Sequence, residues 1–306
     1  MSLIPKYIYK TAPFLHPKLN KLYINTEINN PGWKIKFYND NDCINFLKNE
    51  FSNNNLDLKK NVLNSYNKLI PTAYKADLWR LCVIYEYGGV YSDASQIFKM
   101  PLDKIIDTTK EFCIIKDKTY KIKEKKNHGL QIALFSSVKK HPFLLKYIEN
   151  INMNVQKLAY GTSTLHVTGP HLAYEVANKY NFLDKIKIIG YQNSDSQYIN
   201  NNGKVILEKA KFHKNIVYGN NFQYGHYDKL WRERKIFNIS DENKKYKSEQ
   251  KKKNPVLPRL VKKRPIIKKK NRINNFNHYK NNNLSGFDSS RNIFFLVKEN
   301  VKRVKK

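Results

Sequence analysis

Asp77, Arg80 and Asp93 are the residues of this chain whose types and spacing could do chemistry. Asp77 and Arg80 stand three residues apart, so on a helix they are neighbours on one face. A carboxylate accepts hydrogen bonds and a guanidinium donates them, so together they could hold polar groups of a ligand. A further carboxylate, Asp93, is a suitable ligand for a hard cation such as magnesium or manganese. The pattern predicts a small polar site.

The segment from Thr72 to Ser95 contains the elements that must position these side chains. Its apolar residues, spaced to be buried on a helix, predict a helix that ends before Gly88 in a left-handed stop. Gly89 then permits a tight reversal into a short β-branched and aromatic strand, residues 90–92. Asp93 follows at the carboxyl end of that strand, where open α/β sheets bind ligands. If the chain stays extended, Ser95 lies on the same side as Asp93.

This block resembles the DXD-containing sugar transferases of glycosyltransferase family 32. That family includes yeast-type mannosyltransferases and is similar to the catalytic domains of clostridial glucosylating toxins. Its pattern is an Ala-Asp-x-x-Arg helix followed by Tyr-Gly-Gly-x-Tyr-x-Asp-x-Asp. Residues 76–80 and 87–93 match it, whereas Ser95 replaces the second Asp.

Weaker similarity extends over roughly the first 235 residues. It includes Ile4–Tyr9 as a first strand, Pro31–Asp40 around a second strand, and Thr168-Gly169-Pro170. The resemblance implies an α/β fold, a GT-A-like (Rossmann-like) nucleotide-sugar-binding domain over residues 1–237. A basic C-terminal tail over residues 238–306 follows it.

The resemblance also implies roles for the central residues. Asp93 would contact the ribose and a divalent metal, Mn²⁺ or Mg²⁺, and Asp77 with Arg80 would hold hydroxyls of the donor sugar. Ser95 offers the metal only a neutral hydroxyl, a weaker ligand than a carboxylate. The plainer alternatives are that Asp93 shapes a turn and that Asp77 and Arg80 form a structural salt bridge.

Three further segments are weaker candidates. Tyr9, Lys10 and Thr11 follow the first predicted strand, where a nucleotide would sit, although an aromatic side chain there also serves packing. The segment from Tyr224 to Trp231 resembles the family's closing segment, which makes His226 a candidate metal ligand and Trp231 a candidate lid over the phosphates. Both could instead be packed or surface residues.

Residues 166–171 precede a helix that Pro170 is expected to start, since proline suits the first helical position. The loop could face the acceptor. The alternative is that Thr168 stabilises the start of the helix. No catalytic role is assigned to His166 or His171.

Composition limits the class of protein. A chain of 306 residues and 36.2 kDa with 41% hydrophobic residues can build one large α/β domain, which excludes disorder throughout. Cys43, Cys82 and Cys113 are widely spaced, which indicates neither a disulfide framework nor a zinc site. No leader or apolar run long enough for a membrane span is evident, so a cytoplasmic location is expected, in a bacterial or viral protein from an AT-rich genome.

Half of the net charge of +32 lies in the tail: from Asn238 onward there are 21 Lys and Arg against 5 Asp and Glu, or +16. The basic runs are interrupted by Pro255, Pro258 and Pro265 and lack an apolar period, which predicts an extended or disordered tail. It could bind nucleic acid, another polyanion or an acidic membrane surface, or have no dedicated partner. The short apolar run Ile293–Val297 could dock on the catalytic domain.

The sequence therefore predicts a metal-dependent hexosyltransferase. It would move a sugar from a UDP- or GDP-sugar to a glycan or glycoprotein acceptor, with retention implied by the resemblance. Two alternatives stay open: a nucleotide-sugar-binding protein with weak or no catalysis, because Ser95 replaces an acid, and a polyanion-binding protein that acts through the tail.

Overall fold

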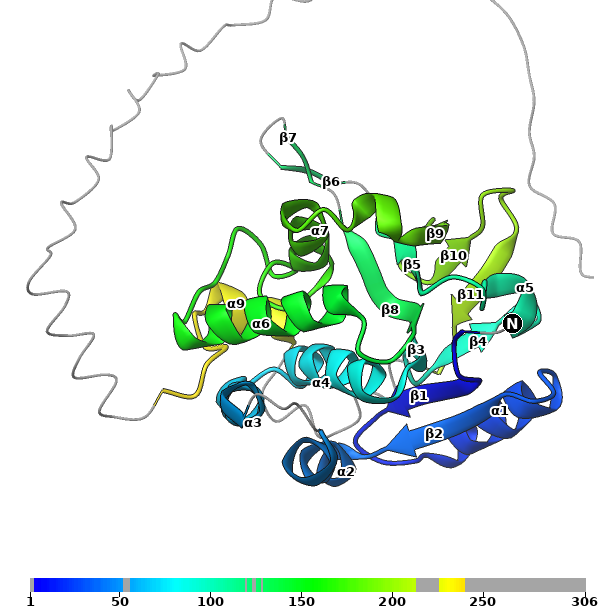
Figure 1. The fold of residues 1–306 in the computed structure, drawn as a ribbon, viewed down its shortest axis with the longest axis horizontal. Helices are drawn as coiled ribbons and strands as arrows, with labels where there is room; N and C mark the ends of the chain where they lie inside the picture. The colour runs from blue at the N-terminus through cyan, green and yellow to red at the C-terminus, as the bar shows by residue number, and fades with distance from the viewer. Residues whose placement is uncertain are drawn as a thin grey trace, which may run out of the picture. The chain divides into compact units, whose positions relative to one another are not determined.

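A nine-stranded sheet is the framework of the computed structural model, which describes residues 3–51, 56–118, 120–122, 125–127, 129–212 and 226–239 (Figure 1). The chain divides into two compact units, residues 1–254 and 255–306. The second unit lies outside the described residues, as do most of the predicted tail and the run Ile293–Val297. The predicted domain boundary after residue 237 stays a prediction.

Helices and strands alternate along the described chain, which confirms the predicted α/β class. The helices are α1 (Pro17–Ile28), α2 (Asp40–Asn45) with a π-helical turn (Phe46–Glu50), α3 (Leu56–Lys68), α4 (Thr72–Tyr87), α5 (Leu102–Ile105), α6 (Pro142–Gln156), α7 (Pro170–Lys179), a 3₁₀ turn (Leu183–Lys185) and α9 (Tyr227–Arg232). The strands are β1 (Tyr7–Thr11), β2 (Lys34–Tyr38), β3 (Gly89–Ser92), β4 (Gln96–Phe98), β5 (Phe112–Lys116), β6 (Tyr120–Ile122), β7 (Lys125–Asn127), β8 (Leu130–Ser137), β9 (Lys187–Gln192), β10 (Gln197–Ile199) and β11 (Val205–Lys209).

The sheet is mixed rather than doubly wound and parallel throughout. Its order is β2-β1-β3-β8-β5-β9-β10-β11-β4, and β6 and β7 form a separate pair. Pairing is parallel between β1 and β2, β1 and β3, and β5 and β9, whereas β8 runs antiparallel to both β3 and β5. The β2-β1-β3 end therefore has three neighbouring parallel strands, as expected of a nucleotide-binding sheet, and β5 with β9 forms a separate parallel pair.

The strands of the sheet centre bury both of their faces. Successive residues belong to different hydrophobic clusters, as the period of two requires: Tyr9, Tyr91, Ile114 and Phe135 on one side, and Ile8, Val90, Ile115 and Leu134 on the other. The first cluster includes buried residues of α4, α6 and α7, which lie together beside the sheet in Figure 1. The second includes Leu102 and Ile105 of α5.

Helix α4 is the most enclosed helix at the site, since every residue from Leu78 to Tyr85 is buried. Trp79, with no exposed surface, contacts Tyr38, Phe46 and Tyr91 through its ring. The predicted helix and strand are thus confirmed at Thr72–Tyr87 and Gly89–Ser92. Because α4 is buried and packed against its neighbours, the backbone positions of Asp77 and Arg80 are fixed.

Two glycines make the turn from α4 to β3. Gly88 has φ of 67° and ψ of −173°, so its φ is positive as expected but its ψ is extended rather than left-handed helical. Gly89 has φ of +103°, and a Cβ added there would lie 2.8 Å from the carbonyl oxygen of Tyr7. Both positions require glycine, because side chains disfavour these φ values. In addition, β1 leaves no room at Gly89, and the Lys139 backbone nitrogen would lie 2.8 Å from a Cβ at Gly88.

None of the described helices is both long and apolar enough to cross a membrane.

Replacing Gly89 by Ala is expected to lower the free energy of unfolding by about 2–4 kcal/mol, because it adds a steric clash with β1 to backbone strain. Urea denaturation followed by tryptophan fluorescence measures the change. The matched control is Gly203→Ala, where φ is +74° but no atom lies within 4 Å of the added Cβ, and about 1 kcal/mol is expected. Equal losses in the two variants would contradict the proposed close approach to β1.

Candidate functional site

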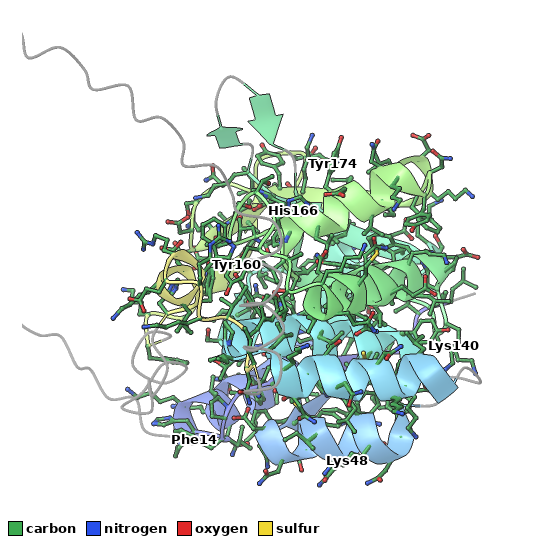
Figure 2. The ribbon with its side chains drawn as sticks, turned by 90° about the vertical axis from the view of Figure 1, so that its left-hand side faces the viewer. Phe14, Lys48, Lys140, Tyr160, His166 and Tyr174 are labelled. Atoms are coloured by element: carbon green, nitrogen blue, oxygen red, sulfur yellow. The ribbon has the colours of Figure 1, made fainter. Side chains whose placement is uncertain are left out.

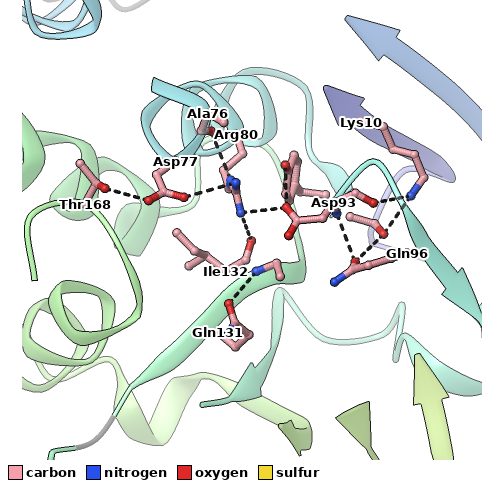
Figure 3. A network of polar contacts seen from close by, with 12 residues as sticks. Lys10, Ala76, Asp77, Arg80, Asp93, Gln96, Gln131, Ile132 and Thr168 are labelled. Carbon is pink, nitrogen blue, oxygen red and sulfur yellow. Dashed lines mark hydrogen bonds and ion pairs between the residues drawn. The ribbon is translucent and has the colours of Figure 1, made fainter. Parts of the chain in front are cut away.

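Arg80 joins the other two predicted residues into one buried chain of charges (Figure 3). Its Nη2 lies 3.2 Å from Oδ1 of Asp77, and its Nη1 lies 3.2 Å from Oδ1 of Asp93. The Arg80 side chain is 8% exposed, that of Asp77 14% and that of Asp93 27%. The network therefore opens to solvent at Asp93.

Other groups hold the guanidinium in place. Nη1 of Arg80 donates to the carbonyl oxygen of Ile132 at 2.9 Å, and Nε donates to that of Ala76 at 3.2 Å. The guanidinium carbon lies 4.3 Å from the ring centre of Tyr91, whose hydroxyl donates to Asp93 Oδ1 at 3.0 Å. Although burial disfavours its charge, Tyr91, Asp93 and Asp77 raise the pKa of Arg80, so it stays protonated.

An irregularity in β8 supplies the backbone part of this network. In the pairing with β5, Ile114 is opposite Phe135 but Ile115 is opposite Gln131, so β8 has extra residues at this point. Ile132, whose carbonyl accepts from Arg80, lies in the extra stretch, as does Ala133, whose carbonyl accepts from the Asp93 amide at 3.0 Å. The bulge thus connects both α4 and the end of β3 to β8.

Thr168 fixes the other end of the chain of charges. Its hydroxyl donates to Asp77 Oδ2 at 2.7 Å, and its side chain is fully buried. The residue that precedes α7 is Gly169, which makes no side-chain cap, so the expectation that Thr168 stabilises this helix start is wrong; Pro170 is the first helical residue, as expected. Burial raises the pKa of Asp77 to about 6, against the opposing effects of Arg80 and Thr168 and with a smaller contribution from Asp93.

Asp93 begins a tight turn held by buried polar groups. Gln96 accepts through Oε1 from the Asp93 amide at 3.1 Å and from the Ser92 hydroxyl at 2.8 Å. The Lys10 ammonium donates to the Ser92 hydroxyl and to the Asp93 carbonyl, both at 3.0 Å. Burial lowers the pKa of Lys10 to about 7, although Asp93 raises it.

This turn contradicts the assumption that the chain stays extended after β3. Ser95 is fully buried and does not line either of the cavities beside Asp93. Its expected alignment with Asp93 is therefore wrong, and its role as a metal ligand has no support from this position.

Two cavities lie beside the charged network formed by Asp77, Arg80 and Asp93. The larger has a volume of about 410 Å³ and the smaller about 170 Å³, and Arg80, Asp93 and Lys209 line both. Asp77 and His226 line the larger one, and Thr11 lines the smaller. A cavity of this size is suited to a small polar ligand.

Tyr9 and Lys10 are 1% and 0% exposed and line neither cavity. The Tyr9 ring stacks on that of Tyr87, with centres 6.1 Å apart, so its position is that of a packing residue. Lys10 supports the turn at Asp93 through its hydrogen bonds to the Ser92 hydroxyl and the Asp93 carbonyl. Direct contact of either with a nucleotide stays a prediction, and the described arrangement favours the packing alternative.

His226 and Trp231 at the predicted closing segment differ in position. His226 lines the larger cavity, while its Nδ1 accepts from the Asp228 amide at 3.3 Å at the start of α9. Trp231 lines neither cavity and donates through Nε1 to the carbonyl of Tyr160 at 2.7 Å, so it packs against the core instead of covering phosphates. Residues 213–225 lie outside the described part. Figure 2 shows Tyr160 beside α9.

The loop residues His166 and His171 are engaged within their own segment. His166 contacts Glu175, and His171 Nδ1 lies 2.8 Å from the Ser163 hydroxyl. Neither lines the larger cavity, although Leu165, Gly169 and Pro170 do. The possibility that this loop faces an acceptor stays a prediction.

Sequence reasoning missed several polar residues of the larger cavity, among them Asp117, Gln131, Gln192 and Lys209. They come from the end of β5 and from β8, β9 and β11, so no local motif joins them. Lys209 is opposite Gln96 in the pairing of β11 with β4, which places it across from the Asp93 turn. The pairing of distant strands, rather than sequence spacing, brings these groups together.

Residues 17–112 match the family model described as "Glycosyltransferase sugar-binding region containing DXD motif". This part of the chain is similar to that glycosyltransferase region. The match contains Asp77, Arg80 and Asp93, and it confirms the resemblance that we drew from their motif.

The comparison with curated proteins gave no match. Among solved structures, one titled "PaToxG Glycosyltransferase" is similar at 18% identity and TM-score 0.42, over 58% of this chain and 70% of that one. Another is titled "Crystal structure of the ligand-free glycosyltransferase domain from the YGT toxin". It is similar at 10% identity and TM-score 0.41, over 63% of this chain and 80% of that one.

The sugar-binding region fits a divalent cation only if the ligand shares in its coordination. Among the described residues, no three His, Cys, Asp or Glu side chains group together as a cation site. Magnesium in phosphate-binding enzymes is commonly held by one or two carboxylates together with phosphate oxygens. Asp93, partly exposed in the cavity, fits such a shared site.

Replacing Arg80 by Met is expected to destabilise the protein by about 3–5 kcal/mol at pH 8, because two carboxylates lose their buried partner. The loss should be smaller at pH 5. Asp77, whose pKa is already about 6 beside Arg80, binds a proton more tightly in the folded state than in the unfolded state. In the Arg80→Met variant the guanidinium is gone, so the pKa of Asp77 rises further. Protonation of Asp77 in the folded state then neutralises the unpaired charge as the pH falls. Urea denaturation at the two pH values tests this.

The matched control is Arg232→Met, which removes an exposed ion pair with Asp228 one helical turn away. At most about 0.5 kcal/mol is expected there at either pH. A loss for Arg80→Met that does not depend on pH would contradict the coupling to Asp77.

Proposed function

We propose that this chain is a metal-assisted glycosyltransferase that moves a hexose from a UDP- or GDP-sugar to a hydroxyl of a glycan or glycoprotein. The observation that supports this proposal most is that Asp77, Arg80 and Asp93 lie in one network at a single cavity, inside the matched sugar-binding region. A GT-A-like fold and retention of the anomeric configuration belong to the same proposal, from the resemblance.

In this reaction the acceptor oxygen forms a bond to the anomeric carbon as the bond from that carbon to the diphosphate oxygen breaks. The proton of the acceptor hydroxyl passes to solvent, and the nucleoside diphosphate leaves with the electron pair and an added negative charge. Arg80 and Lys209 are the cations that line both cavities, so they are placed to stabilise this charge. Asp77 accepts hydrogen bonds from donor-sugar hydroxyls, and Asp93 contacts the ribose.

A bound Mn²⁺ or Mg²⁺ would neutralise charge on the leaving diphosphate. Asp93 would hold it together with phosphate oxygens, and His226, which lines the same cavity, is the other candidate ligand. Ser95 is a less suitable ligand because it is fully buried.

One observation favours a second function, a nucleotide-sugar-binding protein without turnover. Ser95 replaces an acid and is buried, and Asp93 already pairs with Arg80 through Oδ1, so cation binding at Asp93 would be weak. The interpretation as a polyanion-binding protein rests on the tail, which lies outside the described residues except for Asn238 and Ile239.

Replacing Asp93 by Ala is expected to reduce hydrolysis of the preferred donor by on the order of 100-fold or more, because a charged group facing the reacting diphosphate is lost. The measurement is release of nucleoside diphosphate from a panel of UDP- and GDP-hexoses with manganese. Asp184→Asn, an exposed acid outside the cavity, serves as control and should retain wild-type turnover. Donor binding without turnover by the wild type would support the second function, and the absence of both would reject the transferase.

Donor hydrolysis should also rise with pH through about pH 6, as Asp77 becomes ionised and able to accept hydrogen bonds only. Replacing Thr168 by Val removes the hydrogen bond that favours the carboxylate, so the midpoint of this rise should move to higher pH. Thr109→Val is the matched control, because Thr109 donates in the same way to Asp107, which is outside the cavity. A midpoint that is unchanged in Thr168→Val would show that Asp77 does not control the rise.

A further inference from the structure

Asp117 is an acid of the cavity that none of the motifs includes. It follows β5 directly and lines the same cavity as Asp77 and Asp93, yet it is only 4% exposed. Within the described part of the chain, its Oδ2 is buried without any hydrogen-bond partner. Burial of an unpaired carboxylate oxygen destabilises a protein, so the folded chain alone does not explain this position.

The side-chain donors near Asp117 do not supply a hydrogen bond to its Oδ2, because they are engaged elsewhere. Nε2 of Gln131 lies 3.3 Å from Asp117 Oδ1 and 3.0 Å from Oε1 of Gln192, so both of its amide hydrogens are in use. The Lys118 ammonium pairs with Asp195. Burial raises the pKa of Asp117 to about 6, although the Lys118 amide, the Lys118 charge and Gln131 oppose the rise.

The backbone is shaped around this carboxylate. A Cβ at Gly129 would lie 2.8 Å from Asp117 Cβ, 2.9 Å from Oδ2 and 3.2 Å from Pro170 Cβ, so only glycine leaves the carboxylate its place. Pro170 belongs to the segment that contains Thr168, which binds Asp77. Gln131 is the neighbour of Ile132, whose carbonyl binds Arg80. Asp117 is therefore held in fixed relation to the groups proposed to bind the donor sugar.

We propose that Asp117 accepts a hydrogen bond from a hydroxyl of the donor sugar and selects which hexose is bound. A hydroxyl suits the position, since a carboxylate oxygen that lacks a donor binds an O–H group strongly. A cation suits it less, because the described residues do not group three acidic, His or Cys ligands anywhere. A sugar that lacks this hydroxyl, or presents it in the other configuration, leaves Oδ2 unpaired and is rejected.

This inference rests on the proposed function, and the test separates the two. Binding is measured by calorimetry for the UDP- or GDP-hexose that the wild type hydrolyses and for the same nucleoside diphosphate without sugar. Asp117→Asn should bind the nucleotide-sugar roughly 10-fold more weakly, and Asp117→Ala roughly 10- to 100-fold, with the nucleoside diphosphate bound as by the wild type. Discrimination among hexoses should decrease in both variants, and Asp184→Asn should behave as the wild type.

Urea denaturation of the same variants supplies the readout for folding. Asp117→Asn should be as resistant as the wild type or more so at pH 8, because it removes a buried charge. Equal weakening for nucleotide-sugar and nucleotide, or unchanged binding of both, would overturn the role of Asp117 and leave the transferase standing. A wild type that binds no nucleotide-sugar would overturn the proposed function and this role together.

Discussion

The buried positive charge of Arg80 is the constraint on which the site depends. A guanidinium that is 8% exposed must be surrounded by acceptors, and here they come from three parts of the fold: Asp77 on α4, Asp93 after β3 and the Ile132 carbonyl of β8. Loss of any one would leave a charge or a donor unpaired in the interior. The same contacts that stabilise Arg80 therefore determine where the two carboxylates stand, and the structural salt bridge and the binding site are one arrangement.

The cavity gathers acids where burial disfavours their charge. Asp77 and Asp117 both have a pKa raised to about 6, each through burial first. A chain selected only for stability would replace such groups by neutral or apolar ones, which often pack as well or better. Both acids line one cavity, and Asp77 lies within residues 17–112, which match the sugar-binding family model. Acids gathered in this way suit a site that binds hydroxyl groups.

Local pattern was enough to predict the part of the site that is continuous in sequence. The helix spacing placed Asp77 beside Arg80, and the paired glycines placed Asp93 at the end of a strand, as the structure has them. The hydrogen bond from Thr168 to Asp77, and the places of Asp117 and Lys209 in the cavity, could not be predicted, because contacts between distant segments with no local signature bring these residues there. The extended path to Ser95 failed for a related reason: Gln96, a side chain without a recognised motif, closes the turn.

Two buried basic side chains, Lys10 and Arg80, hold Asp93 in place. Lys10 holds its carbonyl and Arg80 its Oδ1, which also accepts from Tyr91. If a divalent ion binds here, the other carboxylate oxygen of Asp93 would hold it, together with oxygens of the ligand. The turn itself is held by hydrogen bonds among Lys10, Ser92 and Gln96. An acid at position 95 would have to ionise in a fully buried place, so the serine is consistent with a site in which the diphosphate supplies the remaining ligands.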